Sequence, residues 1–460
     1  MRRPFFVNAA LAGLRTFETL GVAFACLGLG GMGVTQAEEV PAGYIVNKAN
    51  LSAVGNQTFE GHNLGGMITP VMHKMISELG LTIKLAHSKP VVLPPSLLAA
   101  TEKYSKGVKY DKTTRRISGY ISGIPFPNLS DSDPDLADKI VWNHFYSYPQ
   151  FTDSYVASSR AYLIDGTKGV ERSSDLVNAV LRHIHRDSVE PVAPKFLGDG
   201  AIYRKTLLFN LAPQDIAGTG AYIQRYDDGR VDDSWAYIKS IRRVRRVSGG
   251  TWMDPVPGTV ILNDDAACHS AFPTWYPKYK LVGKQWFLAV VHGVAPGYPG
   301  YKEEDLRDTK NPPYWNPINQ PWEPREVYVY DAFPPEAHPY SRKRIYYDIQ
   351  SNASLWCEMY DKKGQLWKMY SLPLNDAWMA DGQPGVSGGF DLGIDFQRMQ
   401  GSYFDVLYAR QNDIRMDPDL WSPESLTKPE RFSIQGLTKQ YGGATWAAPW
   451  ARAVSGIPNK

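Results

Sequence analysis

The sequence predicts a mainly β protein in which one large antiparallel sheet carries a few helical decorations. In the stretch from Arg325 to Ser371, apolar residues alternate with period two through four short runs that turns separate. The chain also holds 13 Trp, 27 Tyr and 17 Phe residues, which suit strands and apolar pockets. Its 34 Pro and 40 Gly residues indicate many turns. No repeat or clear linker divides the chain, so we expect a single domain over residues 38–460.

Residues 1–37 have the pattern of a cleaved export signal. Arg2 and Arg3 precede an apolar run from Leu20 to Val34, and small residues allow cleavage before Glu38. The apolar run is shorter than the ~20 residues that a membrane-spanning helix needs. We therefore expect a periplasmic protein that does not span the membrane.

The sequence favours neither lipid anchoring nor nucleic-acid binding. Cys26 after Ala25 resembles a lipoprotein cleavage box, but Phe24 fits that box poorly and the apolar run continues past it. Loss of residues 1–37 lowers the net charge from +3 to about +1, because it removes three arginines and one glutamate. Because its positive and negative charges nearly cancel, the mature chain presents no basic field that would attract nucleic acid or anionic lipid.

Three helices are expected before and beside the first long strands. Apolar residues four apart predict a helix over Gly66–Leu79 that stops at Gly80. A second helix should follow a Pro-Pro pair and cover Leu97–Tyr104. The third should run over Pro134–Tyr146 with Asp133 as its N-cap.

Outside the Arg325–Ser371 ladder, period-two alternation and turn residues predict further strands. Ser173–Arg186 fits either a helix or a strand. The Pro-rich segment Gly293–Pro324 should be a long loop that its aromatic residues pack as a lid. The arginines of the last strand before Gly249 should lie on a sheet edge, where they face water or pair with Asp. The expected strands are Val156–Ile164, Ile202–Leu211, Gly220–Tyr226, Ser234–Ile241, the edge strand Arg242–Val247, Lys280–Val291 and a strand or pair within Gly388–Ala409.

Both faces of the Arg325–Ser371 ladder are apolar, so the sheet has no wet side. Either the second face also packs as a sandwich core, or it lines an apolar cavity. If a cavity forms, we expect aromatic residues on one face to bind the ligand, together with a Trp of the third helix. These predicted ligand-binding residues are Tyr328, Tyr330, Tyr346, Trp356, Tyr360, Trp367 and Trp142.

No catalytic residue, metal ligand or cofactor is predicted. Ser387 stands in a Gly-rich segment that resembles a serine-nucleophile turn, but we expect a loop there without the strand-to-helix setting. His183 and His185 share a face if they lie on a strand, yet no second ligand pair accompanies them, and exposed strand histidines are the simpler interpretation. Cys268 and His269 follow two acidic residues in what we expect to be a structural loop.

The two cysteines of the mature chain allow two interpretations. Cys268 and Cys357 could form a disulfide in an oxidising compartment. Cys357 also lies on an apolar strand face, where a free thiol packs as a small hydrophobe.

Several segments together resemble one bacterial family, the family of unknown function numbered 1329. The resemblance runs from about Lys48 to Leu437. It departs from the usual pattern at Ala266–His269, which replaces a more aromatic, glycine-containing segment. The segments that carry it are IPFPNLSDSDP with VWNHF, SWAYIKSIRRVRRVSG, NDDAACHSAFPTWYPKYKLVG, REVYVYDA and SRKRIYYDIQSNASLWCEMYDKKGQLWKM.

The resemblance implies a fold and a function. The family is similar in fold to the periplasmic lipoprotein carriers LolA and LolB, in which a curved, incompletely closed antiparallel sheet wraps an apolar cavity capped by helices. It implies a carrier for a hydrophobic ligand such as a lipid, sterol, acyl chain or aromatic compound, which works with an RND-type transporter. A transporter partner without a ligand of its own is the alternative, and a periplasmic hydrolase is a weaker one.

Overall fold

The computed structural model describes residues 37–147, 153–188, 201–247, 249–294, 306–413 and 420–443. These described residues belong to one compact unit. The predicted signal sequence, residues 1–37, lies outside the described residues except for its last one. No helix in the described part is long and apolar enough to span a membrane.

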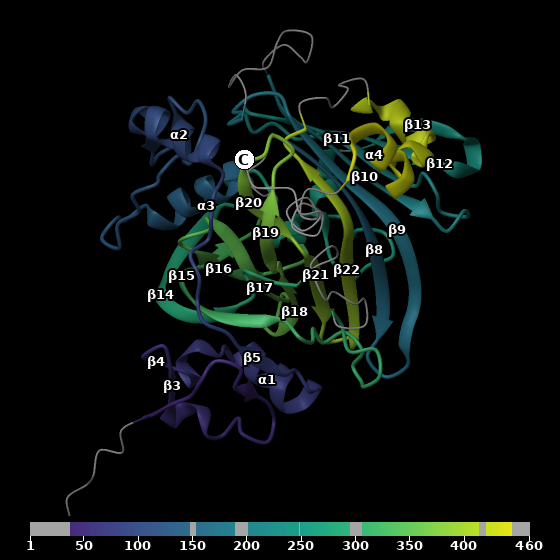
Figure 1. Cartoon of the computed structure of the whole chain (residues 1–460). Helices are drawn as coiled ribbons and strands as arrows, with labels where there is room; N and C mark the ends of the chain where they lie inside the picture. Colours follow the sequence, from purple (N-terminus) through teal and green to yellow (C-terminus); the bar gives the residue numbers. More distant parts are fainter. Residues whose placement is uncertain are drawn as a thin grey trace, which may run out of the picture. The chain divides into compact units, whose positions relative to one another are not determined.

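Within these residues, fifteen strands join in one large, curved sheet (Figure 1). Its neighbours are antiparallel except where β5 meets the start of β15. β13 ends the sheet on one side, and β14 pairs only with β15 on the other, so the sheet is open. The predicted open, curved antiparallel sheet is therefore confirmed.

The order of the strands across the sheet differs from their order along the chain. From one edge to the other they are β13 (Arg243–Val247), β12 (Asp233–Ile238), β11 (Gly220–Tyr226), β10 (Ile202–Ala212), β9 (Gly169–Arg182), β8 (Ser154–Asp165), β22 (Gln400–Gln411), β21 (Phe390–Asp395), β18 (Leu366–Ser371), β17 (Ala353–Tyr360), β16 (Arg342–Asp348), β15 (Pro321–Phe333), β5 (Ile83–Leu85) and β2 (Ile45–Val46), with β14 (Lys278–Ala289) on β15. Smaller sheets hold β1 (Glu38–Glu39), β3 (Gln57–Phe59) and β4 (His62–Asn63); β6 (Lys109–Asp111) and β7 (Arg116–Ser118); and β19 (Leu374–Trp378) and β20 (Pro384–Gly388).

The α-helices lie close to their expected places, with shifted starts. α1 (Pro70–Leu79) begins later than predicted because Thr69, in extended conformation, caps it, and Pro70 takes the first helical position. Gly80 ends it at φ 69°, as predicted. α2 (Pro95–Tyr104) agrees with the prediction, whereas α3 begins two residues late, at Leu136–Ser147. α4 is Ile434–Tyr441.

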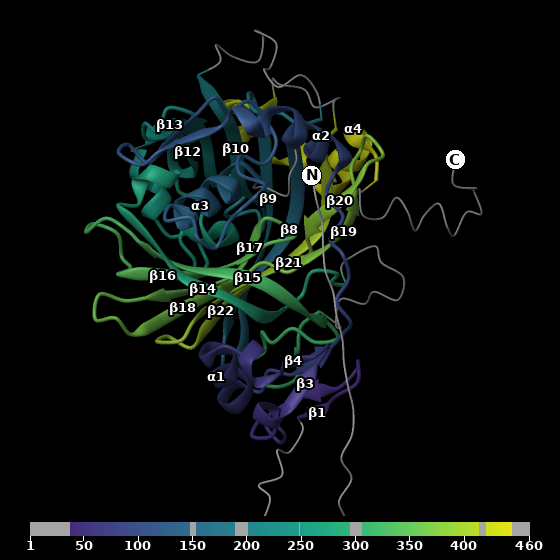
Figure 2. The same ribbon diagram turned by 90° about the vertical axis from the view of Figure 1, so that its left-hand side faces the viewer.

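Two helices cover opposite sides of the sheet. α3 lies against β14 and β17 (Figure 2) on the concave face, where it meets η8 (Pro273–Trp275). α4 lies on the convex face, where Leu437 and Tyr441 join a cluster with Phe209 of β10.

The connection between β13 and β14, residues 249–276, packs onto the concave face, and we call it the plug. It contains η6 (Gly249–Met253) and η7 (Asn263–Cys268). Gly393 of β21 permits this approach, since a Cβ there would lie 2.5 Å from Cγ2 of Ile261. The structural loop expected around Cys268 and His269 is thus largely buried.

The structure decides one open alternative and shortens one predicted loop. Ser173–Arg186, which fitted a helix or a strand, supplies most of β9. The predicted loop Gly293–Pro324 ends earlier than expected, because β15 begins at Pro321. Its described part packs tightly, because Trp315 is fully buried against Gly166 and Gly401, while residues 295–305 lie outside the described residues.

Candidate functional site: a cavity between the sheet and the plug

The plug is fixed to the sheet by a buried ion cluster. Nζ of Lys343, from β16, lies 2.8 Å from Oδ2 of Asp264 and 2.9 Å from Oδ1 of Asp265. All three side chains are fully buried. Tyr276 donates a hydrogen bond to Asp264, and Tyr340 donates one to Asp265. The cluster therefore holds η7 against β16 through charge-assisted bonds.

The electrostatics of this cluster favour its charged form. Burial alone would raise the pKa of Asp264, but the Lys343 ammonium, together with the nearby His338 side chain, outweighs it and holds that pKa well below its usual range. Burial would lower the pKa of Lys343, but the two carboxylates outweigh it and raise the pKa. Nearby, burial lowers the pKa of His269 to about 3, so this imidazole is neutral.

The same lysine also stabilises an unusual turn in the plug. Ala267 and Cys268 both have positive φ, 49° and 70°, a conformation that costs side-chain-bearing residues about 1–2 kcal/mol each. Nζ of Lys343 donates to the carbonyl oxygens of Asp264 and Cys268, at 2.9 and 3.2 Å. The segment Ala266–His269, where the resemblance predicts a departure from the family pattern, thus contains a strained turn.

Beside this cluster, the plug does not fill the concave face, and an inner cavity of about 150 Å3 remains. Counting the part open to solvent, the space within its walls is about 1170 Å3. Strands β8–β11, β18, β21 and β22 form one wall, and residues 252–270 of the plug form the other. A cavity of this size can hold about one aromatic ring or a short alkyl segment.

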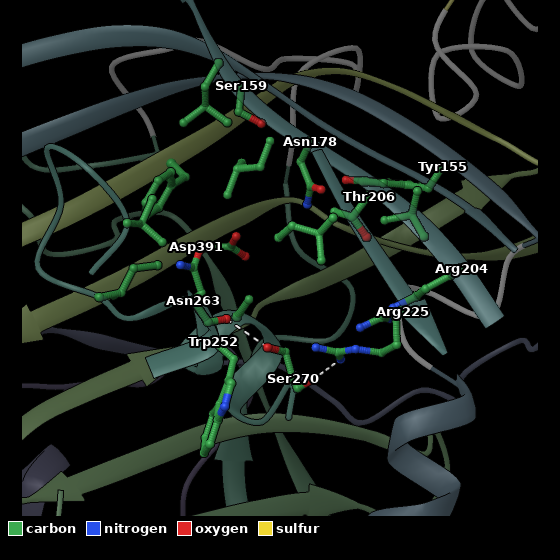
Figure 3. Close-up of a pocket in the computed structure, with 18 of the residues that line it drawn as sticks. Tyr155, Ser159, Asn178, Arg204, Thr206, Arg225, Trp252, Asn263, Ser270 and Asp391 are labelled. Atoms are coloured by element: carbon green, nitrogen blue, oxygen red, sulfur yellow. Dashed lines mark hydrogen bonds between the residues drawn. The ribbon is translucent and has the colours of Figure 1, made fainter. Parts of the chain in front are cut away.

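Its wall is mainly apolar with a few polar groups, as ligand sites commonly are. Polar side chains from neighbouring strands point into it, among them Asn178 of β9, Thr206 of β10 and Asp391 of β21 (Figure 3). The apolar sheet residues are Leu176, Val180, Leu208, Ile223, Phe404 and Val406, and Val256 and Ile261 face them from the plug.

The arginine at one end of the cavity is already paired. Arg225 binds Asp232 with two nitrogens, through Nε at 3.0 Å and Nη2 at 2.7 Å. It also donates to the carbonyl oxygen of Ser270, whose hydroxyl donates to Asn263 (Figure 3). Arg225 therefore joins the plug to β11 and carries little uncompensated charge.

Asp391 is the carboxylate in the apolar part of the wall. Burial raises its pKa from an ordinary value of 3.8 to about 7, and a hydrogen bond from Tyr370 only partly opposes this shift. The side chain keeps some accessible surface because it borders the cavity, although protein surrounds it. Near neutral pH this group is thus close to half protonated.

This shift predicts a pH-dependent stability. The folded pKa lies above the unfolded one, so stability is full below about pH 4 and falls as the pH rises toward 7. At 1.36 kcal/mol per unit the loss has a ceiling of about 4 kcal/mol, and solvent screening of the partly accessible carboxyl reduces it to on the order of 2 kcal/mol. We expect Asp391→Asn to lose this dependence and to be more stable than the wild type at pH 8, as measured by urea unfolding at several pH values.

The exposed plug residue Asp254 provides the control. Asp254→Asn should keep the wild-type pH profile. Superimposable profiles for wild type and Asp391→Asn would contradict the assignment of a raised pKa to this carboxyl.

The predicted ligand-binding residues lie elsewhere. Cross-strand partners share a face. Tyr328 faces Tyr347 and Tyr330 faces Ile345, whereas Tyr346 faces Val329 and Trp356. The expectation that these aromatic residues share one face is therefore wrong, because the register places Tyr328 and Tyr330 on the face opposite Tyr346 and Trp356.

On the concave face, Tyr328 donates to Asp131 at 2.6 Å, and Tyr330 is fully buried. On the other face, Tyr346 stacks on Phe287 with ring centroids 4.9 Å apart, and Trp356 borders a second space of only about 20 Å3.

The remaining three predicted residues are also engaged within the protein. Tyr360 donates to Glu358, Trp367 donates to Asp395, and Trp142 packs with Phe145 and Phe272. None of the seven predicted residues borders the inner cavity. Ligand binding by them stays a prediction.

Sequence reasoning missed the residues that do line the cavity. A usable signal was present, since Asn178 and Asp391 are polar residues within otherwise apolar strand segments. A polar side chain on an otherwise buried, apolar strand often faces a ligand or water, because it needs a hydrogen-bond partner.

The residues considered for catalysis are placed as follows. Ser387 lies in β20 and not in a loop, paired with Asn375 of β19, and its buried hydroxyl has no hydrogen-bond partner in the described part of the chain. Burial raises the pKa of the Cys268 thiol well above its usual range, and Cys268 and Cys357 are both free thiols.

The two histidines of the 181–188 segment are not exposed strand residues. His183 is buried, while His185 has φ 61° and lies 3.1 Å from Oδ2 of Asp227. Over the described ranges, no three His, Cys, Asp or Glu side chains form a group that could hold a metal ion.

Comparisons with known proteins give a family match. Residues 46–428 match the sequence model of the family described as "Protein of unknown function (DUF1329)". No curated protein matches the chain.

Among solved structures, the chain is similar to a putative outer membrane lipoprotein-sorting protein domain from Vibrio parahaemolyticus, with 15% identity, 60% of this chain and 91% of that chain covered, and a TM-score of 0.41. A DUF1329 family protein from Desulfovibrio piger gives 16% identity, 60% and 92% coverage, and a TM-score of 0.41. A LolA superfamily protein from Nitrosomonas europaea gives 12% identity, 60% and 91% coverage, and a TM-score of 0.34.

Proposed function

Because this chain belongs to the DUF1329 family, whose function is unknown, its role rests on its own cavity, and we propose that it is a carrier that binds a hydrophobic ligand there. The supporting observation is the apolar cavity of about 150 Å3 between the concave face and the plug. We place this activity in the periplasm, as the export pattern of residues 1–37 predicts.

The expected affinity follows from the area that a ligand would bury. A ligand that fills the inner cavity and extends into the open part of the space could remove ~300 Å2 of apolar surface from water, which is worth roughly 7 kcal/mol at ~25 cal/mol per Å2. Ordering costs reduce this figure, so we expect dissociation constants that are micromolar or weaker. Such affinities suit a protein that must release its ligand to a partner.

We propose no catalytic role for the chain. A nucleophile needs a base within hydrogen-bond reach or a lowered pKa. The Ser387 hydroxyl has no partner among the described residues, and burial raises the pKa of the Cys268 thiol. Both groups are therefore suited to packing.

The proposal predicts binding of an apolar fluorescent probe. The mature chain, purified from its own periplasm, should bind N-phenyl-1-naphthylamine saturably, and native mass spectrometry should show a copurified lipid or other apolar compound. If no compound copurifies and no probe binds, the carrier proposal fails, and a structural transporter partner without a ligand replaces it.

We also propose an RND-type transporter as the protein that exchanges the ligand. Photo-crosslinking in intact cells, from exposed positions around the cavity, is the test. Capture of the periplasmic domain of such a transporter supports this partner, and crosslinks only to other envelope proteins argue against it.

A further inference from the structure

The edge strand β13 presents two arginines that the fold does not use. Arg243 and Arg245 are exposed, and no hydrogen bond or ion pair engages their side chains within the described part of the chain. Arg246, on the other face of the same strand, is different, because it pairs with Asp233 and lies over the ring of Trp235. Within β13 (Arg243–Val247), the unpaired arginines thus lie on one face.

That face is the concave face, and a row of paired residues connects it with the cavity. Leu208, which borders the cavity, faces Ala221 of β11, and Ala221 faces Ala236 of β12. Ala236 in turn faces Arg245. Since cross-strand partners share a face, Leu208 and Arg245 mark the ends of one row.

This row has the length and the character of a path for an aliphatic chain. Three strand spacings of ~4.8 Å separate its ends by about 14 Å. The two alanines between them have small side chains, so the surface along the row is apolar and projects little from the sheet. In the next row, Ile238 faces Arg243 and is 38% exposed, so an unpaired apolar side chain stands beside the second arginine.

The arginines nearer the cavity are not equivalent candidates for a ligand's charge. Arg225 is neutralised by Asp232. Arg204 is buried, with its guanidinium 5.6 Å from the ring centroid of Tyr203 and 5.8 Å from that of Phe145. A charged head group would therefore find uncompensated positive charge at the β13 edge.

We propose that the ligand is an anionic amphiphile, whose aliphatic chain lies in the cavity and along Ala221 and Ala236 and whose carboxylate or phosphate head group binds Arg243 and Arg245. This assignment rests on the proposed carrier function and adds the chemical class of the ligand. Arginine suits such a head group because its planar guanidinium matches carboxylate and phosphate oxygens.

The test compares three probes with the same chain and different head groups. In each assay, one of dodecanoate, dodecyl phosphate and dodecanol competes with N-phenyl-1-naphthylamine for the mature chain. The displacement is measured at about 50 mM and at about 500 mM salt. We expect Arg243→Gln combined with Arg245→Gln to weaken the two anions about tenfold at low salt and to leave dodecanol unchanged. The anion that loses more affinity in this double variant identifies the head group. Dodecanoate indicates a fatty acid, and dodecyl phosphate indicates a phospholipid.

Two variants control for charge and for folding. Arg246→Gln removes one charge from the same strand on the opposite face and should leave all three probes unchanged. Arg243→Lys with Arg245→Lys should retain most of the anion affinity. Equal binding of dodecanol and the anions by the wild type, or equal losses for all probes in the double Gln variant, would overturn the head-group assignment. Failure of every probe, including N-phenyl-1-naphthylamine, would instead overturn the carrier function itself.

Discussion

Lys343→Met should cost about 3–5 kcal/mol of unfolding free energy, because it leaves Asp264 and Asp265 buried without their counter-charge. It also removes the donor that holds the carbonyls of the strained turn at Ala267 and Cys268. Urea unfolding at pH 7, followed by circular dichroism, measures the loss. The deficit should shrink at acidic pH, since protonation of the abandoned carboxylates removes the unpaired charge.

A lysine on the edge strand β14 is the matched control. Lys280 of β14 is exposed. Lys280→Met makes the same chemical change and should alter stability by less than about 0.5 kcal/mol. A loss below about 1 kcal/mol for Lys343→Met would show that the buried ion cluster does not hold the plug.

Thr206→Trp should weaken binding of an apolar probe at least about tenfold, while the protein stays folded. Thr206 lies on β10 and points into the cavity (Figure 3), where an indole ring would occupy much of the roughly 150 Å3. Overpacking should cost only about 1–3 kcal/mol of stability. Fluorescence titration with N-phenyl-1-naphthylamine measures the affinity, and circular dichroism checks the fold.

The control introduces the same residue on the convex side of the same strand. Leu211 borders a separate surface hollow between β10, β12 and η11 (Pro423–Thr427). Leu211→Trp should bind the probe like the wild type. Undiminished binding by a folded Thr206→Trp variant would place the probe outside the inner cavity and remove the main support for the carrier proposal.

Local sequence patterns alone predicted most of the elements. Alternation gave the four strands β15–β18, and the arginine-rich strand β13 is at a sheet edge as expected. Gly80 marked the end of α1 because only glycine adopts positive φ there without strain. These features depend on interactions between residues close in the chain, so the sequence displays them directly.

The face on which each aromatic residue lies was not predictable in the same way. A one-residue change in pairing sends every side chain of a strand to the other face. The strand register shifts between Tyr346 and Tyr347, and again between Met359 and Tyr360. The face on which each side chain of β15–β18 lies therefore depends on irregularities that the alternation of apolar residues does not reveal. The sequence therefore determined that β15–β18 are strands with two apolar faces, while register decided which residues reach the concave side.

The plug and the cavity belong to the tertiary structure for a similar reason. Asp264 and Asp265 look like solvent-exposed loop residues in the sequence, because burial of two adjacent carboxylates is costly without a partner. That partner, Lys343, is 79 positions from Asp264 along the chain and reaches it only when β16 joins the sheet. The open, mainly β architecture was thus determined by local patterning, whereas the ion cluster that seats the plug, and the cavity left beside it, were decided by long-range pairing of charges.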